Sequence, residues 1–149
     1  MQSSFFTKIV VSVFLVCGCA IASEINDFTS DGCSLFPNGT LEDRHQWCDC
    51  CFNHDIAYWR GGSEDERKEA DLALQACALK RTGSKALADT MYYAVRFGGS
   101  SAFPTWYRWG YGWNYGKGNM LLTEKERKQA DEKFDSYRKT HPEGYCRKR

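Results

Sequence analysis

The sequence has almost no excess charge of either sign. It contains 20 lysine and arginine residues against 19 aspartate and glutamate residues, a formal net charge of +1. Lys8 is the only charged residue before position 23, so the remainder of the chain is close to neutral. A neutral chain gives no electrostatic reason to bind nucleic acid, and we expect no nucleic-acid partner.

The sequence also lacks, after its N-terminal region, an apolar run long enough to cross a membrane. A short apolar run, Ile9 to Val16, follows a single lysine and precedes the small-residue stretch Ala20-Ile21-Ala22. This order is typical of a cleaved secretory signal, so we interpret residues 1–22 as a signal peptide and predict a secreted or periplasmic protein. Two alternatives are a buried core helix and a lipoprotein signal with Cys19 as the lipidated residue.

The sequence also has no odd cysteine once residues 1–22 are removed. Six cysteines then remain: Cys33, Cys48, Cys50, Cys51, Cys77 and Cys146. An even number in an exported chain indicates three disulfides, for which 15 connectivities exist. A zinc site built from these cysteines with His45 and His54 is an alternative, but thiols of exported proteins tend to oxidise.

Strand signals, internal repeats and long linkers are scarce as well. We therefore predict a single, mainly α domain over residues 23–149 that is cross-linked by disulfides. Capping-box patterns begin at Thr40, Ser63 and Thr123. With the glycines as stop signals, they predict four helices. The ranges are 40 to about 60, 63 to 83, 84 to about 97, and a charged helix at about 123–140. The short glycine loop after the first helix favours an antiparallel pair of long helices.

The segment at about 100–118 combines glycine with many aromatic residues. It contains Trp106, Trp109 and Trp113, with Tyr107, Tyr111 and Tyr115. Because this composition is unfavourable for a helix, we predict a loop or a short β-hairpin. The aromatic rings could fill the core of a small protein, rest on a bilayer, or stack against sugars.

The stretch CCFNHDIAYW, Cys50 to Trp59, places a histidine beside an aspartate. In a helix, neighbouring residues point about 100° apart, so His54 and Asp55 each need a separate partner. Asp71 lies among alanines and leucines of the next helix, an unusual position for a carboxylate unless it is paired. Paired with His54, it would fix the imidazole tautomer and leave the other nitrogen as a base. Otherwise Asp71 is a surface acid that pairs with Arg67.

The turn SDGCSLFPNG, residues 30–39, is rich in oxygen-bearing and glycine residues. A carboxylate beside such a turn suits a hard cation such as calcium, and Asp55 is the candidate carboxylate on the helix.

The motif Cys-Cys-x-x-His-Asp-x-x-Tyr, from Cys50 to Tyr58, resembles the active-site helix of the secreted phospholipases A2. Asp71 and Cys77 keep the six-residue spacing of the second helix in that family. Two family cysteines that bond to each other correspond here to Ala57 and Ala70, so both partners of one disulfide are replaced together. The likeness extends over about residues 31–81.

The loop of Asp31, Gly32 and Cys33 is similar to the Asp-x-Cys turn of the prokaryotic and fungal branch, and differs from the animal calcium loop. The resemblance implies that calcium is bound by Asp55, Asp31 and the Gly32 carbonyl. Asp31 could instead only cap a turn.

The resemblance implies a calcium-dependent hydrolase that cleaves the sn-2 ester of phospholipids at a membrane surface, and we expect a monomer. His54 would be the general base, Asp71 would orient it, and Tyr58 would support Asp71, unless it is merely packed. The implied disulfides are Cys33–Cys51 and Cys50–Cys77, with Cys48–Cys146 as the remaining pair.

Two other classes of protein share these features. One is a non-catalytic lipid- or glycan-binding module, in which Trp109→Ala removes function and His54→Gln does not. The other is a structural or toxin-like protein with a vestigial site, which predicts no specific calcium binding.

Overall fold

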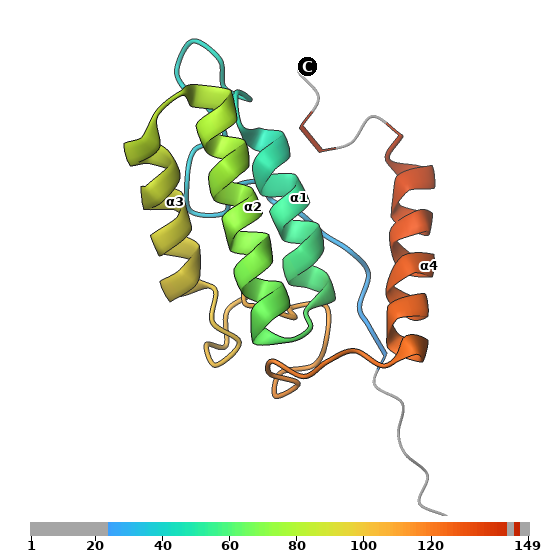
Figure 1. Ribbon diagram of the computed structural model, residues 1–149. Coiled ribbons are helices and arrows are strands. Elements are labelled where there is room, and N and C mark those ends of the chain that lie inside the picture. Colours follow the sequence, from blue (N-terminus) through green and yellow to red (C-terminus); the bar gives the residue numbers. More distant parts are fainter. Residues whose placement is uncertain (1–23, 143–144, 147–149) are drawn as a thin grey trace, which may run out of the picture.

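The computed structural model describes residues 24–142, 145 and 146. Within these residues the chain forms four α-helices and no strand: α1 (Cys48–Arg60), α2 (Glu64–Thr82), α3 (Lys85–Gly98) and α4 (Glu124–Thr140) (Figure 1). The mainly α class is therefore confirmed. None of the described helices is both long enough and apolar enough to cross a membrane. The predicted signal peptide, with Cys19, lies outside the described residues.

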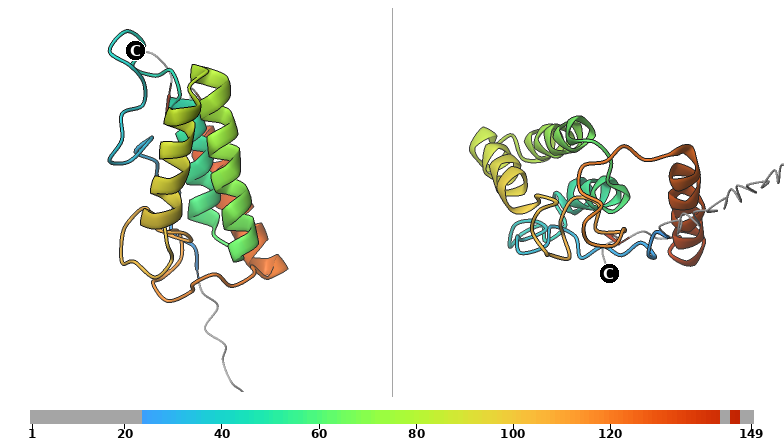
Figure 2. Two further views of the ribbon diagram at one scale, coloured as in Figure 1. Left: turned by 60° about the vertical axis from the view of Figure 1, so that its left-hand side comes forward. Right: turned by 90° about the horizontal axis from the view of Figure 1, so that it is seen from below.

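The first three helices pack together, and α2 contacts both α1 and α3. Helix α4 lies on the side of α1 opposite to α3 (Figures 1 and 2). The N-terminal segment joins α4 to this group, since Ile25 and Phe28 share a core cluster with Trp59 of α1 and Ala130 of α4. A second cluster around Leu74 fills the space between α1, α2 and α3.

Two of the three predicted capping boxes are present. Ser63 Oγ accepts a hydrogen bond from the Glu66 N–H, and the Glu66 side chain accepts one from the Ser63 N–H. Thr123 and Glu126 form the same reciprocal pair at the start of α4. These bonds satisfy backbone donors that have no partner in the first helical turn, so both helices begin where the sequence predicted.

The predicted start of the first helix at Thr40 is wrong, because α1 begins at Cys48. Thr40 Oγ1 accepts a hydrogen bond from the Asp43 N–H, at 3.0 Å, as a capping residue would. The residue three positions on is aspartate, one methylene shorter than the glutamate of a complete capping box. The Asp43 carboxylate instead accepts from the His45 N–H, and the backbone turns until Trp47.

All three disulfides involve the first residues of α1. The bonds are Cys33–Cys51, Cys50–Cys77 and Cys48–Cys146. They are the pairs that the resemblance implied. Because Cys48, Cys50 and Cys51 are all oxidised in this way, they cannot supply thiolates, and the zinc alternative is wrong.

The aromatic segment, residues 100–118, is a series of turns and not a hairpin. Trp109 and Trp113 are only 2% and 1% exposed. Their indole N–H groups donate to the carbonyls of Gly62 at 2.8 Å and Arg60 at 2.6 Å. These carbonyls at and after the end of α1 would otherwise lack partners, so the segment caps the helix and fills the core.

This close packing depends on glycine. Gly61 has φ +68°, and a Cβ built there would lie 2.7 Å from the Cα of Gly110. Only glycine allows the two backbones to approach in this way. Trp109, which the binding-module hypothesis treated as a binding residue, is therefore a core residue, so loss of function in Trp109→Ala would not distinguish lost binding from a damaged core.

Candidate active site

His54 and Asp71 face each other across the contact between α1 and α2. His54 Nε2 lies 2.8 Å from Asp71 Oδ1, and Asp71 is completely buried. The two helices are also tied by the Cys50–Cys77 disulfide, whose cysteines lie four residues from His54 and six residues from Asp71. The residues that the helical spacing predicted as a pair are thus brought together, and the interpretation of Asp71 as a surface acid is wrong.

Tyr58 supports the same carboxylate. Its hydroxyl donates to Asp71 Oδ1 at 2.8 Å, and its ring lies against the His54 imidazole with centroids 4.1 Å apart. Burial, together with the negative charge of Asp71, raises the pKa of Tyr58 above its ordinary value. Tyr58 therefore remains a protonated donor to Asp71, as the sequence predicted.

Arg96 of α3 is a partner of Asp71 that the sequence analysis missed. Its Nη1 donates to Asp71 Oδ2 at 2.8 Å. Burial acts to raise the pKa of Asp71, but the hydrogen bonds from His54 and Arg96 outweigh it and the pKa lies below its ordinary value. An ionised Asp71 can only accept, so His54 Nε2 carries the donated proton and Nδ1 is the basic nitrogen.

His54 forms part of the wall of a cavity of about 290 Å³. No residue of the described chain hydrogen-bonds His54 Nδ1, so this nitrogen is free to face a ligand. The other walls come from α2, α3 and the turn that follows Gly32, and they are mostly apolar. They include Leu35, Phe36, Leu74, Met91, Ala94 and Val95.

Asp55 lines this cavity and also a second one of about 200 Å³. Its Oδ2 accepts from Ser30 Oγ at 2.6 Å. Asp31 lines the second cavity as well, and its Oδ1 accepts from Ser34 Oγ at 2.8 Å. The predicted carboxylates Asp55 and Asp31 therefore border one space, with Gly32 in the same turn.

Asp55 is buried, and no basic side chain in the described part of the chain forms an ion pair with it. Burial raises the pKa of Asp55 to about 8, the Ser30 hydrogen bond lowers it less, and the charge of Asp31 raises it further. A cation between the two carboxylates would offset this cost.

The donor atoms around Asp55 fit calcium. Asp55, Asp31 and Ser30 border one space with oxygen-bearing side chains, and calcium takes carboxylate, carbonyl and water oxygens. No group of three or more His, Cys, Asp and Glu side chains that could hold a metal occurs within residues 24–142, 145 and 146. A calcium ion would therefore depend on carbonyls and water for most of its ligands.

Tyr111 connects the aromatic segment to this loop. Its hydroxyl donates to the Thr29 carbonyl at 2.5 Å, and the Asp55 carbonyl lies 3.3 Å away. This role of Tyr111 could not be predicted, because nothing near Tyr111 in the sequence indicates a contact with residue 29.

Comparison of the chain with models of known protein families, with curated proteins and with solved structures finds no significant match. Any functional assignment therefore depends on the geometry of this site and on the short motif at Cys50 to Tyr58.

Proposed function

We propose that the chain is a calcium-dependent phospholipase A2-like hydrolase that cleaves the sn-2 ester of phospholipids. The observation that carries this proposal is the contact between His54 Nε2 and the buried Asp71, with the His54 ring in the wall of an apolar cavity. Two disulfide-linked antiparallel helices that hold such a pair are also what the resemblance implies. A base that faces an apolar cavity suits hydrolysis of an acyl ester.

The chemical roles follow from the two nitrogens of His54. Nδ1 accepts a proton from a water molecule as that water attacks the ester carbonyl. Asp71 holds the Nε2–H and stabilises the imidazolium that forms. When the bond to the glycerol oxygen breaks, His54 returns the proton to that oxygen. The products are a fatty acid and a lysophospholipid, and no covalent enzyme intermediate is needed.

Calcium is the proposed cofactor, held by Asp55, Asp31 and the Gly32 carbonyl. Bound there, it would supply a positive charge for the substrate phosphate and a Lewis acid for the ester carbonyl. Asp55 follows His54 directly on α1 and borders both cavities, so the proposed cation site lies beside the cavity that His54 lines.

The proposed partner is a phospholipid surface approached by an exported monomer. Apolar side chains near the cavity are unusually exposed: Leu35 82%, Phe97 79% and Trp106 65%. Leu35 lines the first cavity and Trp106 the second, and Phe97 precedes Gly98 in the cavity wall. Insertion of these side chains into a bilayer would bring the cavity to the lipid.

The decisive experiment is fatty-acid release from mixed phospholipid vesicles by oxidised protein of residues 23–149. The assay is run with calcium, with a chelator, and with the His54→Gln variant. His141→Gln, at the exposed end of α4, is the matched control. Calcium-dependent release that is lost only in His54→Gln supports the proposal.

No release by a folded protein with three disulfides would refute the hydrolase. Vesicle binding that survives His54→Gln but is lost in Trp106→Ala would then indicate the non-catalytic lipid-binding module. Trp106 replaces Trp109 in this test because Trp106 is exposed and Trp109 is buried.

A further inference from the structure

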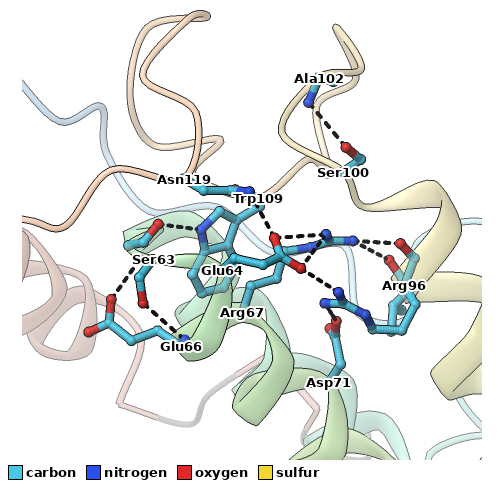
Figure 3. A network of polar contacts seen from close by, with 12 residues as sticks. Ser63, Glu64, Glu66, Arg67, Asp71, Arg96, Ser100, Ala102, Trp109 and Asn119 are labelled. Carbon is cyan, nitrogen blue, oxygen red and sulfur yellow. Dashed lines mark hydrogen bonds and ion pairs between the residues drawn. The ribbon is translucent and has the colours of Figure 1, made fainter.

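Arg96 makes two ion pairs in opposite directions from the last turn of α3. Its Nη1 donates to Asp71 Oδ2 at 2.8 Å, and its Nη2 donates to Glu64 Oε1. Figure 3 shows the Arg96 guanidinium between these two carboxylates. The side chain is therefore fixed at both ends of its planar group, which is the geometry that arginine provides and lysine does not.

Glu64, in the first turn of α2, is the centre of a larger network (Figure 3). It accepts from Arg96, from Arg67 Nη1 at 3.3 Å and from Asn119 Nδ2 at 2.8 Å. Burial acts to raise the pKa of Glu64, but the Arg96 hydrogen bond and the Arg67 charge hold it below its ordinary value. Charges of alternating sign thus run from Asp71 through Arg96 and Glu64 to Arg67.

Arg67 holds the backbone at Arg96. It is almost completely buried, and its Nη2 donates to the Arg96 carbonyl at 2.6 Å and to the Val95 carbonyl at 3.3 Å. Both carbonyls lie in the last turn of α3, and the Val95 carbonyl also accepts from the Gly99 N–H at 2.9 Å. Both the backbone and the side chain of Arg96 are consequently fixed by α2.

Asp71 in turn has both of its oxygens occupied. Oδ1 accepts from His54 and Tyr58, and Oδ2 accepts from Arg96. Without Arg96, Oδ2 would be a buried acceptor with no partner, and the carboxylate would turn to find one. Such a turn would move Oδ1 away from His54.

From this geometry we propose that Arg96, held in place by Glu64, is a positioning residue for the His54–Asp71 pair. It acts through Asp71 and does not touch the cavity. The inference rests on the proposed hydrolase, because it assigns Arg96 a part in that reaction.

The kinetic test compares Arg96→Met with Arg96→Lys. We expect Arg96→Met to lower kcat roughly 10- to 100-fold with KM within about twofold, because orientation of the base is lost and lipid binding is not. Arg96→Lys should restore part of the loss, since an ammonium reaches one carboxylate but not both. Arg127→Met is the matched control: it removes another ion pair to the start of α2, with the half-buried Glu66, and should leave kcat unchanged.

A second measurement does not depend on activity. In the wild type, the His54 Nε2–H should give a protected, downfield proton resonance, assigned by its loss in His54→Gln. Arg96→Met should shift or remove this resonance, and Arg127→Met should leave it in place. If the wild type releases no fatty acid, the proposed function fails, and the resonance alone decides whether Arg96 orients the pair.

Unchanged kcat in folded Arg96→Met, or an unchanged His54 resonance, would overturn the inference. A fall in melting temperature with normal kcat would assign Arg96 a structural role only. Should Arg96→Met not fold, Arg96→Lys and Glu64→Gln take its place. Glu64→Gln removes the charge that holds Arg96, so it should produce a smaller change in the same direction.

Discussion

Two of the disulfides should have different roles. Removal of Cys48–Cys146 should cost more stability, whereas removal of Cys33–Cys51 should cost the response to calcium. The Cys48–Cys146 bond closes a loop with a sequence separation of 98, and the Cys33–Cys51 bond one of only 18. The chain-entropy relation gives a loss of about 4 to 5 kcal/mol for the first bond and about 3 kcal/mol for the second. The difference of about 1.5 kcal/mol corresponds to about 5 °C in melting temperature for a chain of this size.

The calcium response should depend on Cys33–Cys51 and not on Cys48–Cys146. Cys33–Cys51 ties the turn that contains Asp31 and Gly32 to α1 at a position four residues before Asp55. Without it the two carboxylates Asp31 and Asp55 are no longer held around one space. Cys48–Cys146 joins α1 to the C-terminal end of the chain and touches neither cavity.

The assay is thermal unfolding of the two double-alanine variants, each with and without calcium. We expect the Cys48→Ala/Cys146→Ala protein to melt lower and to keep the rise in melting temperature on adding calcium. The Cys33→Ala/Cys51→Ala protein should melt higher and lose that rise. The reverse order of melting temperatures would refute the entropy argument, and an intact calcium response without Cys33–Cys51 would refute the assigned loop.

Three further predictions test the architecture, the aromatic core and the cation site. Ala57→Cys/Ala70→Cys should form a fourth disulfide, seen as the loss of two thiols by intact mass and alkylation; two free thiols would contradict the resemblance at the helix pair. Trp113→Phe should lower the free energy of unfolding in urea by about 1 to 3 kcal/mol, because a helix-terminal carbonyl loses its buried donor. The exposed Trp106→Phe should change it by less than about 0.5 kcal/mol. At pH 7 without calcium, Asp55→Asn should raise the melting temperature, because Asp55, with its pKa raised to about 8, must take up a proton to be buried and asparagine need not. The same variant should abolish the calcium-induced rise.

Features set by neighbouring residues could be predicted from the sequence. The capping boxes at Ser63 and Thr123 form because each involves residues three positions apart. The pairing of His54 with Asp71 was predictable for a related reason. Helical periodicity places His54 on one face, and a carboxylate among apolar neighbours on the next helix needs a partner.

Features set by distant contacts could not be predicted. Arg96 lies 25 residues from Asp71 on a separate helix, and an arginine in a last turn is ordinary in itself. Composition likewise does not tell which tryptophans of one segment are buried. Trp109 and Trp113 are buried while Trp106 is exposed, a division that the end of α1 imposes.

The concentration of cysteines at the start of α1 has a consequence for how the protein is made. Cys48, Cys50 and Cys51 lie within four residues, yet each bonds to a different distant partner. In an unfolded chain the three thiols lie at almost the same sequence distance from any one partner, so the entropy of loop closure hardly favours one pairing over another. Only the folded helix, which points neighbouring residues about 100° apart, assigns each thiol to its partner. Correct oxidation must therefore follow helix formation or be corrected afterwards, and efficient production calls for an oxidising compartment with active disulfide exchange.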